Sequence, residues 1–140
     1  MIQALHAILG EIDERKNSTG ATDEMVKIPK VTMLYGSRES SDILGNALLQ
    51  KWASDHPDHF KCIEILSHEP DDSEWEGRKG YINETLLQEF LPSPTASTPF
   101  QIFICGPPPM YDFLSGPRTE KEVTGLLGTM GYNSEQVYKF

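Results

Sequence analysis

The sequence predicts one α/β domain with a mainly parallel sheet flanked by helices. Four short apolar runs, at 31–35, 60–66, 100–105 and 137–140, have the length of buried strands. Segments with apolar residues at helical spacing separate these runs, and strands that alternate with helices usually pair in parallel. The 140 residues have room for one domain with a real core, and they contain no internal repeat.

The first thirty residues should form a helix followed by a loop. Residues 1–9 have helical periodicity and Gly10 follows them, so the predicted helix ends there. Residues 10–30 are polar and include Asn17-Ser18-Thr19-Gly20, which predicts a loop before the first strand.

A helix and a turn should connect the first two strands. Gly36 ends the first strand, and a helix capped by one of residues 40–42 should then run to about Ser54. Its expected apolar stripe consists of Ile43, Ala47, Leu48 and Trp52. His56 to His59 should form a turn around Pro57, an interpretation that we favour over a metal site for the two histidines.

The second half of the chain continues the alternation. The expected segments are an acidic loop (67–80), a helix (81–91), a proline-rich connection (92–99) and two further helices (109–114 and 120–130). The first of these helices should be capped near Asn83. The last should end at Gly131, since a glycine commonly follows the C-cap of a helix.

Composition and charge exclude several classes of function. The formal net charge is -9, from 12 Lys and Arg against 21 Asp and Glu, which argues against nucleic acid as a partner. Cys62 and Cys105 lie far apart without a CxxC spacing, so we expect a reducing compartment rather than a disulfide framework. The sequence has no apolar run of the roughly 18 residues that a membrane span needs and no signal-peptide pattern. Any membrane anchor is therefore expected in segments outside this chain.

Three segments that contain glycine or polar residues follow predicted strands directly. They are Gly36-Ser37-Arg38-Glu39, Ser67-His68 and Cys105-Gly106-Pro107. Ligands of open parallel sheets bind beyond the carboxyl ends of the strands, so all three are expected at one ligand-binding edge. Gly106 has no side chain and permits close approach to the backbone. Pro107 to Pro109 lack amide donors and form a stiff ledge rather than a phosphate cradle.

The segment Cys105-Gly106-Pro107-Pro108-Pro109-Met110 is similar to the CGPPPM signature of the cytochrome b5 reductase family, within the ferredoxin reductase-like group. Three other stretches resemble the same family in order and spacing. They are Tyr35 to Leu44 with its Asp-Ile-Leu, Gly77 to Ile82 with its Gly-aromatic-Ile step, and Met130 to Phe140 with its aromatic end. The resemblance covers almost the whole chain and implies a Rossmann-like, nicotinamide-nucleotide-binding domain of the ferredoxin reductase C-terminal type.

The resemblance also implies roles for individual residues. Cys105 is the expected catalytic residue, placed against the nicotinamide for hydride transfer. The expected cofactor-binding residues are Gly36, Ser37, Arg38, Asp42, Gly80, Tyr81, Gly106, Pro107, Pro108, Met110 and Phe140. Asp42 should disfavour NADPH, because a carboxylate accepts hydrogen bonds from ribose hydroxyls but repels the added 2′-phosphate. Arg38 could pair with that phosphate, so NADH is favoured and NADPH stays an open alternative.

Two parts of the family pattern have no counterpart here. Met1 to Leu5 resembles the helix that follows the family's glycine-rich GGTGITP turn, but that turn, the strand before it and the flavin-binding barrel are absent. We therefore expect residues 1–140 to be a partial domain that lacks the first, central strand of its sheet. The unfilled position would leave buried backbone groups unpaired. The isolated chain is not expected to bind FAD or to turn over.

The function implied by the resemblance is that of a flavin-dependent reductase. In the full-length protein, hydride would pass from NADH to FAD on a flavin-binding domain, and electrons would go on to a haem protein such as cytochrome b5. One alternative is a mitochondrial flavoprotein that assists haem attachment to cytochrome c as a partner of the haem lyase. Another is a non-catalytic fragment. The expected location is the mitochondrial or endoplasmic-reticulum membrane, reached through segments outside this chain.

Overall fold

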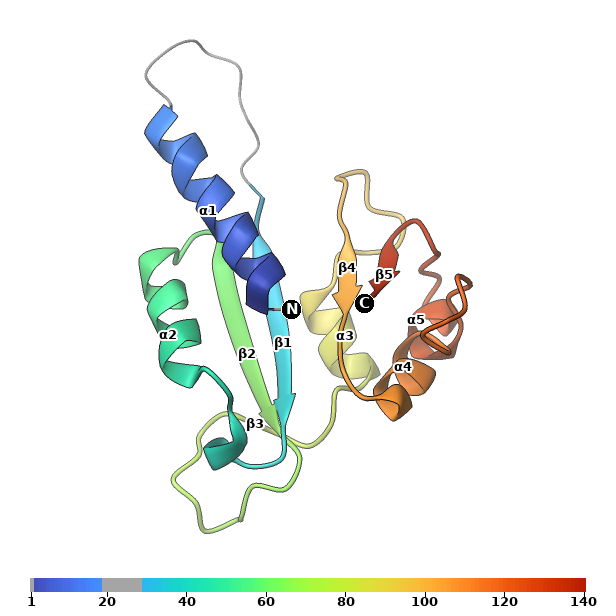
Figure 1. The fold of residues 1–140 in the computed structure, drawn as a ribbon. Coiled ribbons are helices and arrows are strands. Elements are labelled where there is room, and N and C mark those ends of the chain that lie inside the picture. Colours follow the sequence, from blue (N-terminus) through green and yellow to red (C-terminus); the bar gives the residue numbers. More distant parts are fainter. Residues whose placement is uncertain (1, 19–28) are drawn as a thin grey trace. The chain divides into compact units, whose positions relative to one another are not determined.

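The computed structural model describes residues 2–18 and 29–140, and the chain divides into two compact units, Met1–Ile82 and Asn83–Phe140 (Figure 1). Both units combine helices with parallel strands, so the predicted α/β class is confirmed. The strands form two sheets, one of three strands and one of two, rather than the single sheet that the sequence predicted.

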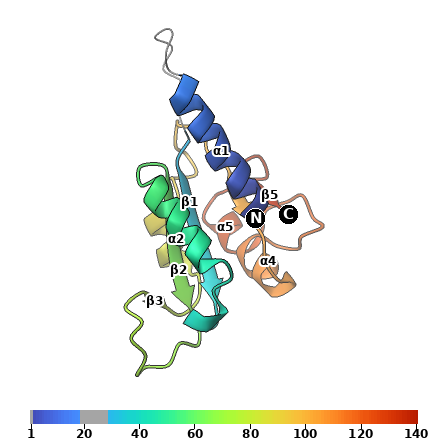
Figure 2. The same cartoon turned by 60° about the vertical axis from the view of Figure 1, so that its left-hand side comes forward.

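The first unit holds a three-stranded sheet. Its elements are helices α1 (Ile2–Ser18) and α2 (Asn46–Asp55), the 3-10 helix η1 (Ser40–Asp42), and strands β1 (Val31–Ser37), β2 (Phe60–Leu66) and β3 (Arg78–Lys79). β1 and β2 run in the same direction and pair over their full length, as two views show (Figures 1 and 2). The short strand β3 pairs with the end of β2, so the order is β1-β2-β3.

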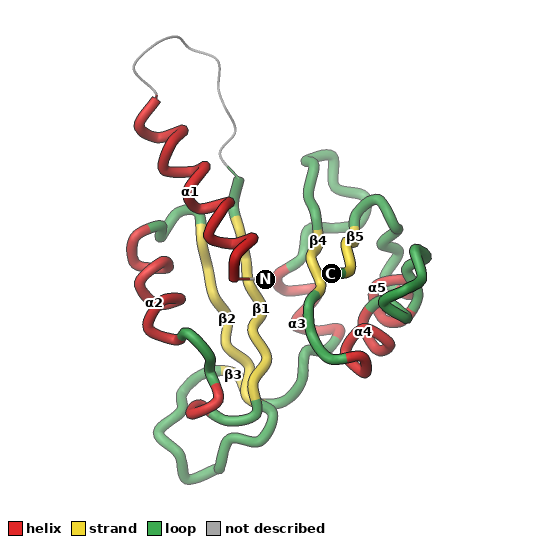
Figure 3. The backbone as a smooth tube through the Cα atoms, in the orientation of Figure 1, coloured by secondary structure: helices red, strands yellow, loops and turns green. Residues whose placement is uncertain are grey.

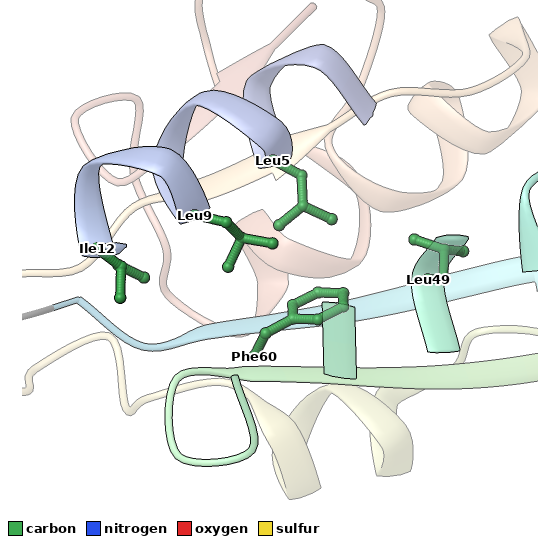
Figure 4. Packing of buried hydrophobic residues seen from close by; sticks show 5 residues of the cluster. All are labelled: Leu5, Leu9, Ile12, Leu49 and Phe60. Carbon is green, nitrogen blue, oxygen red and sulfur yellow. The ribbon is translucent and has the colours of Figure 1, made fainter. Parts of the chain in front are cut away.

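Helices α1 and α2 build the core of this unit on one face of the sheet. Leu5, Leu9 and Ile12 follow each other at helical spacing on α1 and meet Leu49 of α2 and Phe60 of β2 (Figure 4). Half-buried residues at alternate positions of the strands pack against the same cluster, namely Val31, Met33, Tyr35 and Cys62. This packing fixes the face of β1 and β2 that is turned toward the helices.

The first helix is longer than predicted. It passes through Gly10 and ends at Ser18, so the loop prediction was wrong over 10–18, and its remainder over 19–28 lies outside the described residues. Ile12 is fully buried and extends the apolar stripe by another turn. Burial of such a side chain contributes about 1.5–3 kcal/mol, which exceeds the roughly 1 kcal/mol cost of a glycine inside a helix.

The helix predicted between the first two strands is interrupted. The backbone forms η1, leaves the helix, and starts α2 after Gly45, whose φ of 71° lies in the left-handed region. This break shifts the helical phase, so Leu49 is buried while Leu48 is 39% exposed and Ala47 is exposed. The predicted stripe was therefore right at Ile43 and Trp52 but wrong at Ala47 and Leu48.

The second unit holds a two-stranded sheet with three short helices (Figure 3). Its elements are α3 (Glu84–Phe90), β4 (Ile102–Ile104), α4 (Pro108–Leu114), α5 (Gly125–Thr129) and β5 (Val137–Lys139). β4 and β5 are parallel, with Ile102 opposite Val137 and Ile104 opposite Lys139. Ile104, Val137 and the buried side chains of the helices form the apolar interior of this unit.

Two helix ends in this unit match their sequence signals. The Asn83 side chain accepts a hydrogen bond from the Leu86 N–H (3.0 Å) and caps α3, which confirms the predicted cap although the helix starts at Glu84 rather than at 81. Gly131 has a φ of 93° and follows α5. The Gly131 and Tyr132 N–H groups donate to carbonyls of the last turn, as in a Schellman motif.

The last predicted helix is the largest error in this unit. Only Gly125–Thr129 is helical, instead of 120–130. The Lys139 ammonium donates to the main-chain oxygens of Pro117 (3.1 Å), Glu120 (3.0 Å) and Glu122 (2.8 Å). These carbonyls converge on one cation, which a helix would not allow because its carbonyls point along its axis. Residues 117–122 are therefore a loop.

The remaining differences are smaller. The third predicted strand shortens to Ile102–Ile104, and the predicted acidic loop contains the two-residue strand β3. The turn around Pro57 and the irregular stretch over 92–99 are confirmed. Among the described strands, β1 pairs only with β2 and β4 only with β5.

None of the helices within 2–18 and 29–140 is both long and apolar enough to cross a bilayer. Over the same ranges, no group of three or more His, Cys, Asp and Glu side chains is arranged to hold a metal ion.

Candidate functional site

The segments that follow β1 and β2 lie side by side, as predicted. The Ser67 N–H donates to the Ser37 main-chain oxygen (3.0 Å), and the His68 N–H donates to that of Arg38 (2.8 Å). The parallel register, with Ser37 opposite Leu66, brings both strand ends to the same edge of the sheet. The side chains of Arg38 and His68 are exposed at this edge.

Gly80 and Tyr81 reach the same edge through β3. The Gly80 N–H donates to the Leu66 main-chain oxygen (2.8 Å), and Gly80 has a φ of 105°, a conformation that favours glycine. The Tyr81 ring is 69% exposed and meets the His68 imidazole edge-on, with 6.2 Å between ring centroids. An exposed aromatic ring held in this way offers a flat surface against which a base or a sugar can pack.

Three carboxylates, those of Glu39, Asp42 and Glu69, gather around η1 at this edge. Asp42 accepts a hydrogen bond from the Glu39 N–H (3.3 Å) in a reciprocal capping box. Glu69 accepts hydrogen bonds from the Ser40 N–H (2.7 Å) and hydroxyl (3.0 Å). The Ser40 N–H lowers the pKa of the Glu69 carboxyl, which is therefore ionised at neutral pH. Residues 36–42 and 67–69 thus form an acidic rim, with Arg38 as its cation.

Sequence reasoning missed Glu69, because the residue was assigned to the acidic loop over 67–80 and given no role. It lies 29 residues from Ser40 along the chain, so no local spacing links the two. The parallel pairing of β1 with β2 brings them together.

The second unit holds the Cys-Gly-Pro segment. Cys105 directly follows β4, and residues 105–108 are all exposed. α4 begins at Pro108 with Pro107 as its N-cap, so the segment is stiff and offers few amide donors. A Cβ on Gly106 would lie only 2.8 Å from the Met110 sulfur, so the missing side chain lets Met110 pack behind the ledge.

Phe140 lies beside the same strand end. Its N–H donates to the main-chain oxygen of Ile104 (3.1 Å), the residue before Cys105. Its ring contacts those of Phe103 and Tyr138, with centroids 5.8 and 5.1 Å away. Phe103 and Tyr138 are 45% and 53% exposed, so these rings form an open aromatic face on β4 and β5. Each unit therefore brings together the predicted residues that it contains.

A cavity of about 230 Å³ adjoins the Cys-Gly-Pro ledge. Its lining consists of Gly106, Pro108, Tyr111, Asp112, Pro117, Arg118 and Thr119. Apart from Gly106 and Pro108, sequence reasoning singled out none of these residues. The loop that carries Arg118 and Thr119 is held by Lys139, which lies 17 to 22 residues away from the loop carbonyls it binds.

The two cysteines differ in ways that an alkylation experiment can detect. Burial of the Cys62 thiol, and secondarily the charge of Glu64, raise its pKa to about 11, whereas Cys105 is exposed. At pH 8 roughly one Cys62 in a thousand is thiolate, the reactive form. Iodoacetamide should therefore alkylate Cys105 at least about tenfold faster than Cys62. Peptide mass mapping over a time course measures both rates.

Cys105→Ser is the matched control for this experiment. It should abolish the fast phase and leave only slow alkylation of Cys62. Equal rates at the two cysteines of the folded chain would contradict the burial of Cys62.

Comparison with known proteins agrees with these features. Residues 3–116 match the sequence model of the oxidoreductase NAD-binding domain. NADH-cytochrome b5 reductase 2 of Aspergillus clavatus is 44% identical over 115 residues, which are 79% of this chain and 35% of that protein. The protein of the same name from Neurospora crassa is 40% identical over 115 residues, 79% of this chain and 33% of that protein. The chain thus spans about a third of the length of these relatives.

Two solved structures share the fold. The CS-b5R domains of human Ncb5or, in their NAD+ form, align with a TM-score of 0.62 and 25% identity, covering 81% of this chain and 29% of that chain. The cytochrome b5 reductase domain of Ulva prolifera nitrate reductase aligns with a TM-score of 0.62 and 24% identity, covering 84% of this chain and 40% of that chain.

Fold and site together define an NAD-binding domain of an oxidoreductase. The chain belongs to the oxidoreductase NAD-binding domain family, in its cytochrome b5 reductase-like group. The sequence resemblance carried by Cys105 to Met110 is thereby confirmed.

Proposed function

We propose that this chain is the nicotinamide-nucleotide-binding part of a flavin-dependent reductase that oxidises NADH. The observation that carries the proposal is the exposed Cys105-Gly106-Pro107 ledge at the end of β4, in a chain that belongs to the cytochrome b5 reductase-like group. The ends of parallel strands are the usual place for a nucleotide in such folds.

The ledge suits the nicotinamide ring rather than the phosphates. Pro107, Pro108 and Pro109 carry no amide N–H, so the ledge lacks the donors that an anion requires. Gly106 leaves its backbone open to a flat ring, and Cys105 supplies a small, polarizable side chain next to it. Cys105 is proposed as the residue that contacts the nicotinamide and places it for hydride transfer.

The acidic rim of the first unit suits the ribose of NADH. A carboxylate can accept hydrogen bonds from the 2′- and 3′-hydroxyls, while Asp42, Glu39 and the ionised Glu69 would all repel a 2′-phosphate. Arg38 and Lys79 are the cations that would act in the opposite direction, and the Lys79 charge contributes to the lowered pKa of Glu69. Three carboxylates against these two cations favour NADH.

The remaining steps extend beyond this chain. When bound, NADH would supply a hydride to FAD on a flavin-binding domain of the same protein, and electrons would leave singly for a haem protein such as cytochrome b5. The residues of this chain would bind the nucleotide, orient it and hold its reacting edge in place. Attachment to a mitochondrial or endoplasmic-reticulum membrane, through other segments, is part of the proposal.

Titration with NAD+ and NADP+ tests the binding and its specificity. The 140-residue chain should bind NAD+ more tightly than NADP+ by isothermal calorimetry. Asp42→Asn keeps an acceptor for the Glu39 N–H but removes the charge. It should shift the ratio of the two affinities toward NADP+ by about fivefold, roughly the effect of one unit charge a few ångströms away in water.

Asp58→Asn is the control for net charge, because Asp58 is an exposed residue in the turn before β2, at the opposite end of the strands. It should leave the ratio unchanged. An unchanged ratio in Asp42→Asn would remove Asp42 from specificity. Absence of saturable binding of either nucleotide would contradict the proposed function itself.

A further inference from the structure

The end of β4 is held by a buried tyrosine hydroxyl. Tyr111 of α4 is 3% exposed. Its Oη lies 3.1 Å from the main-chain oxygen of Ile104 and 2.8 Å from that of Phe140, and it donates its hydrogen bond to this pair. The Phe140 N–H donates to the same Ile104 oxygen (3.1 Å). The hydroxyl therefore links α4 with the last residue of β4 and the residue after β5.

This link matters because the two strands are short. β4 and β5 contain three residues each and pair with each other, with Ile104 opposite Lys139 as the last pair. So short a ladder gives weak restraint at its ends. Cys105 follows Ile104 immediately, and Phe140 follows Lys139. The Tyr111 hydroxyl thus holds the backbone on both sides of the point where the Cys-Gly-Pro ledge begins.

We infer that Tyr111 is a positioning residue for the nicotinamide, acting through the backbone of Ile104 and Phe140 on Cys105. The inference rests on the proposed function of the ledge. Tyr111 is not assigned a catalytic role, because its hydroxyl is buried and already engaged with two main-chain oxygens. Without that hydroxyl the two oxygens would face each other with no shared donor, and the strand ends would separate.

Tyr132 provides a matched control within the same unit. It is also buried, and its hydroxyl donates to one main-chain oxygen, that of Pro92 (2.7 Å). Tyr132→Phe and Tyr111→Phe each remove one hydroxyl, which contacts one main-chain oxygen in the case of Tyr132 and two in the case of Tyr111. Pro92 has no sequence or hydrogen-bond link to β4 or to Cys105, whereas the Tyr111 partners adjoin them.

The experiment compares the wild-type chain with these two variants. Tyr111→Phe should raise the rate of Cys105 alkylation by iodoacetamide at least about threefold, because a loosened strand end exposes the thiol more often. It should also weaken NAD+ binding about tenfold, through loss of preorganisation. Tyr132→Phe should lower the denaturation midpoint to a similar extent but leave the Cys105 rate and the NAD+ affinity at their wild-type values.

The outcomes separate this inference from the proposed function. Wild-type protein that does not bind NAD+ overturns the proposed function, while the Cys105 alkylation rate still tests the link to Tyr111. The inference is overturned if Tyr111→Phe and Tyr132→Phe have the same Cys105 alkylation rate and the same NAD+ affinity. Rapid alkylation of Cys62 would report that a variant has unfolded.

A measurement on the wild-type chain tests directly whether bound NAD+ stabilises this strand end. NMR hydrogen exchange follows the Phe140 N–H, which is bonded to Ile104, and the Tyr132 N–H, which is bonded to Leu127. Saturating NAD+ should slow exchange at Phe140 at least about threefold and leave Tyr132 unchanged. Equal exchange at Phe140 with and without bound NAD+ would overturn the role of this strand end.

Discussion

Replacing Leu49 with alanine should lower the free energy of unfolding by about 3 kcal/mol, within the range for large-to-small changes in a core. Leu49 is fully buried and packs with Leu5, Leu9 and Phe60 between the helices and the sheet of the first unit. The change removes apolar contact area and leaves a cavity between the two helices and the sheet, which the structure cannot easily close. Urea denaturation followed by circular dichroism measures the difference.

Leu48→Ala is the control, since it makes the same chemical change at the adjacent position of α2. Leu48 is 39% exposed and is not part of the cluster, so its replacement should cost less than about 1 kcal/mol. Equal losses in the two variants would contradict the helical phase that the left-handed Gly45 sets.

Replacing Cys105 with alanine should slow flavin reduction by NADH about tenfold or more in the flavin-containing protein proposed above. The expected cause is lost positioning, because a displacement of about 1 Å at a reacting centre can cost a hundredfold in rate. The FAD content should not change, since Cys105 lies in the part that is proposed to bind NADH and not in the flavin-binding domain. Stopped-flow absorbance of the flavin at saturating NADH measures the rate.

Cys62→Ala provides the same substitution away from the ledge. Cys62 is half-buried in β2 and packs against the core of the first unit. Its replacement should reduce stability and leave the reduction rate at the wild-type value. A Cys105→Ala protein with an unchanged rate would remove Cys105 from the nicotinamide site, whatever its effect on binding.

Features that depend on neighbouring residues could be predicted from the sequence. Phe60 to Leu66 is a strand with the predicted bounds, because five of its seven residues are apolar and polar residues follow it directly. Asn83 caps α3 and Gly131 ends α5 through hydrogen bonds to residues only a few positions away. The exposed Cys-Gly-Pro ledge follows from a strand that meets three prolines.

Features that depend on distant residues could not be predicted. α1 continues past Gly10 because Ile12 packs in the same apolar cluster as Leu49 and Phe60. Residues 117–122 form a loop instead of a helix because the Lys139 ammonium binds their carbonyls. The apolar cluster and the Lys139 ammonium lie at no fixed sequence spacing from the segments whose structure they change. Hydrophobic periodicity and helix propensity therefore could not predict either interaction.

The sequence by itself determined the α/β class, through local patterns of apolar residues, and the family, through the similarity of Cys105 to Met110 and three other stretches to its signatures. Tertiary structure alone decided how these residues are supported. It placed Glu69 against Ser40 and the Tyr111 hydroxyl between Ile104 and Phe140, pairs that parallel strand pairing brings together. Parallel strands are joined by long crossovers, so residues that meet at their ends are necessarily far apart in the chain.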